Sequence, residues 1–164
     1  MLKGIPTLVG LGEGAQLLID LFLKIREIEI NGQIIPVLSK HVQAKNHTIG
    51  INDELYTYKF ETLWMALNQK NYALYLKSKE EEKPIMLKKI AVANILAFYK
   101  ACNLYLNPDE RILLQLKAGE KATKFKNQDM LAFEGSFTTN ALLPDYIGLG
   151  KSTSRGFGTI FIEH

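Results

Sequence analysis

Apolar and polar positions along this chain form two separate blocks of predicted strands and helices. In the first block, the apolar run Ile5–Val9 predicts a short strand, and apolar residues at helical spacing predict a helix over 13–25. Isoleucines then flank Asn31-Gly32 on both sides and predict a pair of strands. The dipeptide itself favours the tight turn of a hairpin. The first block is therefore predicted to run strand, helix, strand, strand.

The second block follows Lys40–Asp53, a polar and irregular stretch that we interpret as a linker. Its apolar patterns predict four strands, over 55–60, 112–116, 130–139 and 157–162. Between the first two strands lies a helical region that is interrupted at Glu80–Pro84 and continues as a long helix over 85–104. We expect that helix to bury a wide apolar stripe on a sheet. The stripe is formed by Met86, Ile90, Ala93, Ala97 and Ala101 and is broadened by Leu87, Val92, Ile95, Leu96 and Phe98.

This order of elements predicts an α+β fold. Residues 53–164 fit a ferredoxin-like (RRM-like) βαββαβ domain for RNA binding, with the second helix reduced to the glycine-rich loop 148–154. Residues 1–52 fit the remnant of an N-terminal ferredoxin-like domain, an incomplete half that lacks the opening strand and helix.

Composition narrows the class of protein. With 164 residues, 47% of them hydrophobic, the chain can build a real core, and its net charge of +3 says little about partners. Charge is concentrated at 111–128, where five basic residues face one acid. Cys102 is the only cysteine, which excludes an internal disulfide and a cysteine-based zinc site. Because no apolar run approaches ~18 residues, we expect a cytoplasmic protein without a membrane segment.

The segment Gly148–Gly158 carries the clearest chemistry. It combines four glycines with two cations and two serine hydroxyls, a set that suits close contact with phosphate oxygens. We predict an RNA-binding loop there, and the basic stretch 117–126 should add electrostatic attraction. The predicted RNA-binding residues are Gly148, Gly150, Lys151, Ser152, Ser154, Arg155, Gly156 and Gly158 of the loop, with Lys117, Lys121, Lys124 and Lys126 of the basic stretch.

Other motif interpretations are weaker. Gly150-Lys151-Ser152 is not a nucleotide-phosphate loop, because Asp145 stands where that motif needs glycine and a strand pattern follows. The glycines at 10–14 are better explained by a strand-to-helix turn than by dinucleotide binding. Residues 155–158 match the start of the RNA-recognition signature, within which Phe157 is either a stacking platform or a core residue.

With these motifs in place, the chain resembles a known family. Residues 64–72, 89–100, 125–128, 133–140 and 143–160 are similar to the CRISPR repeat-RNA-processing endoribonucleases, above all to their subtype b branch. The resemblance implies two tandem ferredoxin-like domains, binding of CRISPR repeat RNA in antiviral defence, and a glycine-rich loop placed against RNA. It also implies cleavage through the ribose 2′-hydroxyl, with a cyclic phosphate product and without a metal or other cofactor.

This chain departs from the family pattern in the segment that carries catalysis. The family's general acid–base histidine lies in an N-terminal segment without a counterpart here, and His41 and His47 fall in the later interdomain region. We therefore expect an N-terminally truncated member that binds repeat RNA without efficient cutting, and we assign no catalytic residue. Two alternatives stay open: an active metal-independent endoribonuclease that uses His41, His47, Tyr146 or a partner subunit, and a scaffold protein that does not bind RNA.

The incomplete first half also predicts a partner. A small sheet with one helix leaves strand edges and an apolar face uncovered, and a second copy of the chain would cover both. We expect a homodimer through residues 1–50, or exchange of that unit between chains. Other CRISPR-associated proteins are further candidate partners.

Overall fold

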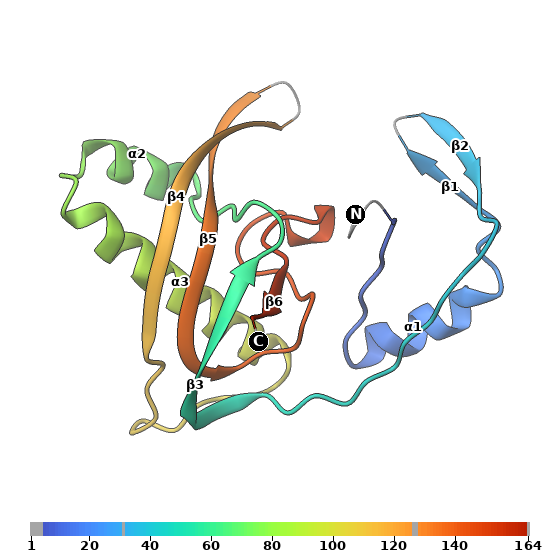
Figure 1. Cartoon of the computed structure of the whole chain (residues 1–164), viewed down its shortest axis with the longest axis horizontal. Helices are drawn as coiled ribbons and strands as arrows, with labels where there is room; N and C mark the ends of the chain where they lie inside the picture. Colours follow the sequence, from blue (N-terminus) through green and yellow to red (C-terminus); the bar gives the residue numbers. More distant parts are fainter. Residues whose placement is uncertain (1–4, 31, 126–127, 164) are drawn as a thin grey trace. The chain divides into compact units, whose positions relative to one another are not determined.

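The computed structural model of the chain describes residues 5–30, 32–125 and 128–163 (Figure 1). Contacts within the chain define two compact units, Met1–Asn46 and His47–His164, and each is described by itself.

Over residues 5–30 and 32–46, the first unit has one helix and one hairpin. Helix α1 (Glu13–Phe22) precedes the antiparallel strands β1 (Glu27–Ile30) and β2 (Gln33–Pro36), which place Ile28 opposite Ile35. Gly32 adopts φ +78°, as the predicted turn requires, while Asn31 lies outside the described residues. The strand predicted over Ile5–Val9 is wrong, because residues 6–11 have no regular structure. Pro6 offers no amide for a ladder hydrogen bond.

The second unit contains a four-stranded sheet, two α-helices and one 3₁₀ turn. In chain order the elements are β3 (Gly50–Phe60), α2 (Gln69–Lys77), α3 (Glu82–Ala101), β4 (Leu114–Phe125), β5 (Gln128–Leu142), η1 (Thr153–Arg155) and β6 (Ile160–Ile162). The strand order is β4-β5-β3-β6 with antiparallel neighbours, and α3 crosses behind β4 and β5 in Figure 1. This is the ferredoxin-like arrangement that the sequence predicts, and the short connection around η1 stands where the second helix would be.

Three predicted boundaries need correction. The linker over Lys40–Asp53 ends earlier, because β3 begins at Gly50. The basic stretch 117–126 does not link two strands: its residues through Phe125 belong to β4, which pairs continuously with β5. The last strand is only Ile160–Ile162, because Thr159 pairs with Gly148 at an isolated bridge instead.

The core of the second unit lies between the sheet and its helices. Phe60 stacks on Trp64 with ring centroids 5.2 Å apart, and Phe133 lies 5.8 Å from Trp64 and 5.7 Å from Tyr75. Helix α3 adds Leu87, Ala91, Ile95 and Tyr99, all buried. The stripe predicted on this helix is therefore correct only in part. Leu87 and Ile95 are buried, and Met86, Ile90, Val92 and Phe98 are half-buried against the core. In contrast, Ala93, Leu96, Ala97 and Ala101 are exposed.

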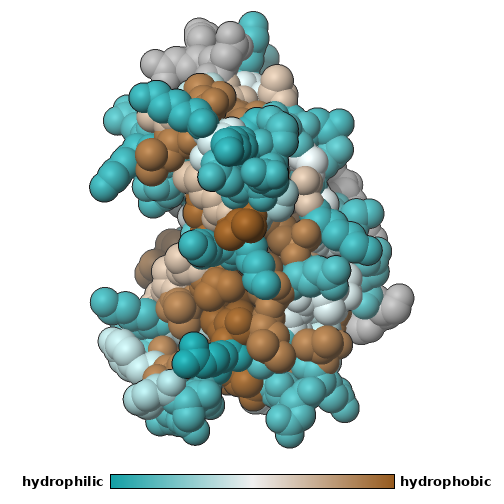
Figure 2. All heavy atoms as spheres, turned by 90° about the vertical axis from the view of Figure 1, so that its left-hand side faces the viewer, coloured by the Kyte–Doolittle hydropathy of each residue, from teal (hydrophilic) through white to brown (hydrophobic). Residues whose placement is uncertain are grey.

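The outer side of the helices is partly apolar. Figure 2 faces the side of the molecule on which α2 lies, and hydrophobic side chains are gathered there among hydrophilic ones. The exposed large apolar residues of the two helices are Tyr72, Leu74, Leu76, Ile85 and Leu96. None of the helices in the described ranges is long and apolar enough to cross a membrane.

Candidate nucleic-acid interface

The glycine-rich loop, residues 148–158, is fixed by backbone hydrogen bonds to the segment that follows β3. The amide of Lys151 donates to the carbonyl oxygen of Met65, and the amide of Gly158 donates to that of Leu63, both at 2.9 Å. Within the loop, the amide of Leu149 donates to the carbonyl oxygen of Gly158 at 2.9 Å. The loop therefore rests on the well-packed connection between β3 and α2, and its base is part of the folded core.

Three of the four loop glycines are required by packing within the protein. A Cβ atom on Gly158, at φ +67°, would lie 1.9 Å from the carbonyl oxygen of Leu149. On Gly150, at φ +97°, it would lie 2.8 Å from Nε1 of Trp64, and on Gly148 it would lie 2.6 Å from Cβ of Thr153. Gly156 alone of the four has nothing within 4 Å of that position and is exposed. The glycines thus have a structural reason that needs no ligand, and their contact with RNA stays a prediction.

Trp64 is the buried support below Gly150. Its side chain is 0% exposed, and its Nε1 donates to Oδ1 of Asn94 on α3 at 3.1 Å. This pair joins the helix layer to the loop. The sequence did not predict this contact, because positions 64, 94 and 150 are far apart in the chain and no local pattern links them.

The tip of the loop presents polar groups to solvent. Lys151, Ser154 and Arg155 are exposed, while Ser152 is half-buried and left-handed at φ +58°. The backbone amides of Ser152, Thr153 and Ser154 donate to no acceptor within the described part of the chain. Two cations, hydroxyls and three such amides can all bind phosphate oxygens. The structure therefore brings together the polar residues that the sequence singled out in this loop.

The charged residues of the basic stretch lie on both faces of the sheet. Lys117 and Lys121 are exposed on the face opposite the helices. Glu120, the acid between them, points to the helices and accepts a 2.7 Å hydrogen bond from the hydroxyl of Tyr75. Burial, helped by this hydrogen bond, raises the pKa of Tyr75. Alternation along β4 therefore places Lys117 and Lys121 on one face of the sheet and Glu120 on the other, which Lys124 shares.

Lys121, Lys124 and Lys126 differ in what the structure shows of their side chains. Lys121 Nζ lies 3.0 Å from a carboxylate oxygen of Glu134, an exposed pair that salt screens strongly. Lys124 is exposed, and Lys126 lies outside the described residues.

Of the candidate catalytic residues, His41 belongs to the first unit, and His47 and Tyr146 belong to the second. His41 and His47 are exposed, and the only hydrogen bond of His41 in the described part of the chain is to Gln43, with their Nε2 atoms 3.4 Å apart. Tyr146 is exposed just before the loop, with φ +65°, and its amide donates to the carbonyl oxygen of Ile160 at 2.6 Å. Among the described residues, no three metal-binding side chains come together.

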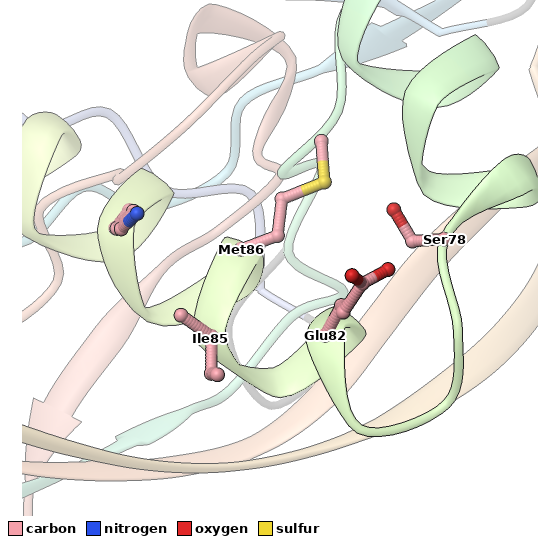
Figure 3. Close-up of a pocket in the computed structure, with 5 residues that line it drawn as sticks. Ser78, Glu82, Ile85 and Met86 are labelled. Carbon is pink, nitrogen blue, oxygen red and sulfur yellow. The ribbon is translucent and has the colours of Figure 1, made fainter.

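A hollow lies at the turn between α2 and α3 (Figure 3). Its polar groups already cap helix ends: the Ser78 hydroxyl donates to the Leu74 carbonyl, and the Glu82 carboxylate accepts from the Lys79 amide, both at 2.9 Å. The hollow is lined by Ser78, Glu82, Ile85, Met86 and Lys89.

Comparisons with known proteins agree with this architecture. Residues 50–162 match the sequence model of the Cas6b C-terminal domain. An uncharacterized protein of Methanocaldococcus jannaschii, MJ0978, is 34% identical over 146 residues, which are 86% of this chain and 95% of that protein.

Two solved structures are similar as well. A crystal structure of the CRISPR RNA processing endoribonuclease Cas6b matches with a TM-score of 0.79 and 31% identity, over 92% of this chain and 72% of that one. A further crystal structure of Cas6b matches with a TM-score of 0.68 and 37% identity, over 71% of this chain and 59% of that one. The chain thus spans only part of the length of these proteins. Sequence model and structures agree, and the chain belongs to the Cas6b family of CRISPR-associated proteins.

Proposed function

We propose that this chain binds CRISPR repeat RNA through the tip of the glycine-rich loop, assisted by the lysines of β4. The observation that carries the proposal is the exposure of Lys151 and Arg155 on a loop whose base is fixed to Met65 and Leu63. Cations on a rigid base bind phosphates with little loss of conformational freedom. In this proposal, residues 53–164 form the RNA-binding domain and residues 1–52 form a separate N-terminal unit.

Fluorescence anisotropy with labelled repeat RNA tests this binding. The affinity of the wild-type protein should fall steeply between about 50 mM and 200 mM salt, because bound lysine and arginine side chains release counterions from the RNA. Arg155→Ala should weaken binding, whereas Lys88→Ala, which removes an exposed charge from α3, should not. A salt-independent affinity, or equal affinities for Arg155→Ala and wild type, would contradict the proposal and favour the scaffold alternative.

We further propose that this chain cuts repeat RNA poorly. Cleavage by the 2′-hydroxyl needs one group to accept its proton and another to protonate the leaving oxygen, and losing such a group lowers the rate by about 10²–10⁴-fold. His47, which shares the second unit with the loop, makes no hydrogen bond to it within the described residues. Incubation of repeat RNA with the protein and a chelator, beside a Cas6b that cuts RNA, should give little product with a cyclic phosphate end.

One observation favours an active enzyme as the second candidate. Tyr146 is 44% exposed at the entrance to the loop, and its left-handed backbone is unusual for a bulky residue and costs about 1–3 kcal/mol. Strain of this kind concentrates at functional positions. If metal-free cleavage is efficient and is lost in Tyr146→Phe, which keeps the ring and removes the hydroxyl, the active-enzyme candidate replaces our proposal.

We also propose a homodimer that forms through residues 1–50. Leu17, Leu23 and Leu38 of the first unit are 59%, 76% and 94% exposed, and no residue of α1 is fully buried. Sedimentation should show a dimer that Leu17→Glu weakens. Leu76→Glu on α2 is the matched control, since Leu76 is 60% exposed. A monomer at all micromolar concentrations would exclude the dimer.

A further inference from the structure

The face of the second unit's sheet that points away from the helices carries a row of side chains across all four strands. Pairing places Lys117 of β4 opposite Ser136 of β5, Ser136 opposite Lys59 of β3, and Lys59 opposite Phe161 of β6. Their neighbours along the strands are buried or half-buried on the helix side, which fixes this row on the other face. At about 4.8 Å between strands, the row spans about 14 Å.

The chemistry of this row suits nucleic acid. Lys59 and Lys117 are exposed, and Ser136 and Phe161 are half-buried. The next pair along the strands is polar as well, because the hydroxyls of Thr57 and Thr138 lie 2.9 Å apart in a hydrogen bond. Two cations flank a hydroxyl, and one aromatic ring ends the row. Positive charge along a backbone path combined with an aromatic ring is the usual means of binding single-stranded RNA without sequence preference.

The opposite side of the unit makes the contrast. The exposed large apolar residues of α2 and α3 include Leu74, Leu76 and Ile85, which belong to the helix layer and not to this row. A protein partner that needs apolar contacts would find them on the helices. The sheet face offers charge and hydroxyl groups instead, and strands β4 and β6 connect it to the basic stretch and to the end of the glycine-rich loop.

We propose that a single-stranded segment of the bound RNA crosses this sheet face, with Lys117 and Lys59 on its phosphates and Phe161 stacked on one base. This inference rests on the proposed RNA binding and names the form of RNA and the surface that follow from it. Neither Lys59 nor Phe161 belongs to the glycine-rich loop or to the basic stretch, so their contribution can be measured separately from that of Arg155.

The test is anisotropy with an unstructured, labelled RNA and with a duplex of the same sequence, over about 50–200 mM salt. For the single strand, Lys59→Gln should lower the slope of log affinity against log salt by about 0.7, the value for one lost phosphate contact. Phe161→Leu should weaken binding about 5- to 100-fold with an unchanged slope, and Phe161→Tyr should restore it. Lys88→Gln on α3 is the matched control for charge. Duplex binding should change less than single-strand binding in each variant.

The outcomes separate the two proposals. If wild type binds no RNA, the proposed function fails. If Arg155→Ala weakens binding while Lys59→Gln and Phe161→Leu bind as wild type does, the proposed function stands and this inference is overturned; that result would leave the face for a protein. Lys59 is exposed, so Lys59→Gln keeps the fold and the test remains valid even if Phe161→Leu unfolds.

Discussion

The two units of this chain differ most in how much apolar surface they bury. In the second unit, Trp64, Ile95 and Phe133 are 0% exposed, and the cluster around them joins both helices to the sheet. In the first unit, no residue of α1 is fully buried and all four residues of β2 are exposed. One helix and one hairpin have too little interior to offset the entropy of ordering them.

This difference places most of the chain's tight packing in the second unit. There a buried core lies beneath the glycine-rich loop, whereas α1 of the first unit has no fully buried residue. The four variants that follow are ordered from the largest expected loss of stability to the smallest, and each contrasts a specified position with a less specified one.

Phe133→Ala should be the most damaging substitution. It removes a ring that contacts Trp64 and Tyr75 in the core, and truncations of this kind cost about 3–5 kcal/mol in the free energy of unfolding. Leu18→Ala on α1, where Leu18 is only half-buried, should cost less than about 1 kcal/mol in a monomer. Urea unfolding followed by the fluorescence of Trp64 reports the first change, and hydrogen exchange of α1 reports the second. Equal losses would mean that the first unit has a core of its own.

Gly158→Ala should have the next largest effect. Left-handed backbone alone costs about 1–2 kcal/mol for a residue with a Cβ atom, and the overlap with Leu149 should add about 1–3 kcal/mol. Gly156→Ala is the control, because Gly156 also has a positive φ, +83°, and has no atom within 4 Å of the new Cβ. Thermal unfolding should therefore rank the two variants clearly. If both lose the same stability, the base of the loop is not packed as described.

Most helices and strands could be predicted from the sequence, but many of their tertiary contacts could not. The hairpin at Gly32 and the start of α1 at Glu13 follow from local rules, and so does the order of strands that defines the ferredoxin-like sheet. The exposed cations of the glycine-rich loop were also identifiable, since charge and glycine spacing are local properties. Contact of these residues with RNA remains a prediction.

What escaped the sequence depends on distant partners. Apolar residues surround α3 widely, so periodicity alone did not separate the buried stripe through Ala91 and Ile95 from the exposed one through Ala93 and Ala97. The basic stretch was not recognised as a strand because lysine is a poor strand former. At the edge of a sheet, however, lysine is favoured because it discourages pairing with other chains, and β4 is an edge strand of the described sheet. The alternation of Tyr58, Lys59 and Phe60 along β3 was a local signal that Lys59 lies on the face opposite the two aromatic residues.

Tyr99→Phe should cost less than the glycine variant and should depend on pH. The hydroxyl of Tyr99 donates to the carbonyl oxygens of Gly50 and Leu142, the latter at 3.2 Å, and losing the donor costs about 1–3 kcal/mol near neutral pH. Burial raises the pKa of Tyr99 from 10.0 to about 12. The unfolded chain therefore loses this proton first, and wild-type stability falls as pH rises from 10 through 12.

The phenylalanine variant lacks that titration. Its stability deficit relative to wild type should be largest near neutral pH and should shrink between the two pKa values, which urea unfolding at several pH values can measure. Since other groups titrate equally in both proteins, the difference isolates Tyr99. A deficit that stays constant with pH would mean that Tyr99 ionises alike in the folded and unfolded chains.

Asn68→Ala should have the smallest of the four effects. It tests a difference in helix capping between the two units. The side chain of Asn68 accepts a 2.8 Å hydrogen bond from the amide of Asn71 and caps α2, while α1 follows Gly12 without any side-chain cap. Losing an N-cap costs about 1 kcal/mol, and Asn68→Asp should keep most of the stability because a carboxylate also accepts this bond. Because α2 carries the buried Tyr75 that holds Glu120 on the helix side, its fraying should also be seen as faster hydrogen exchange in α2. If Asn68→Ala unfolds like wild type, the cap adds nothing to packing that is already sufficient, and the two units differ through their cores alone.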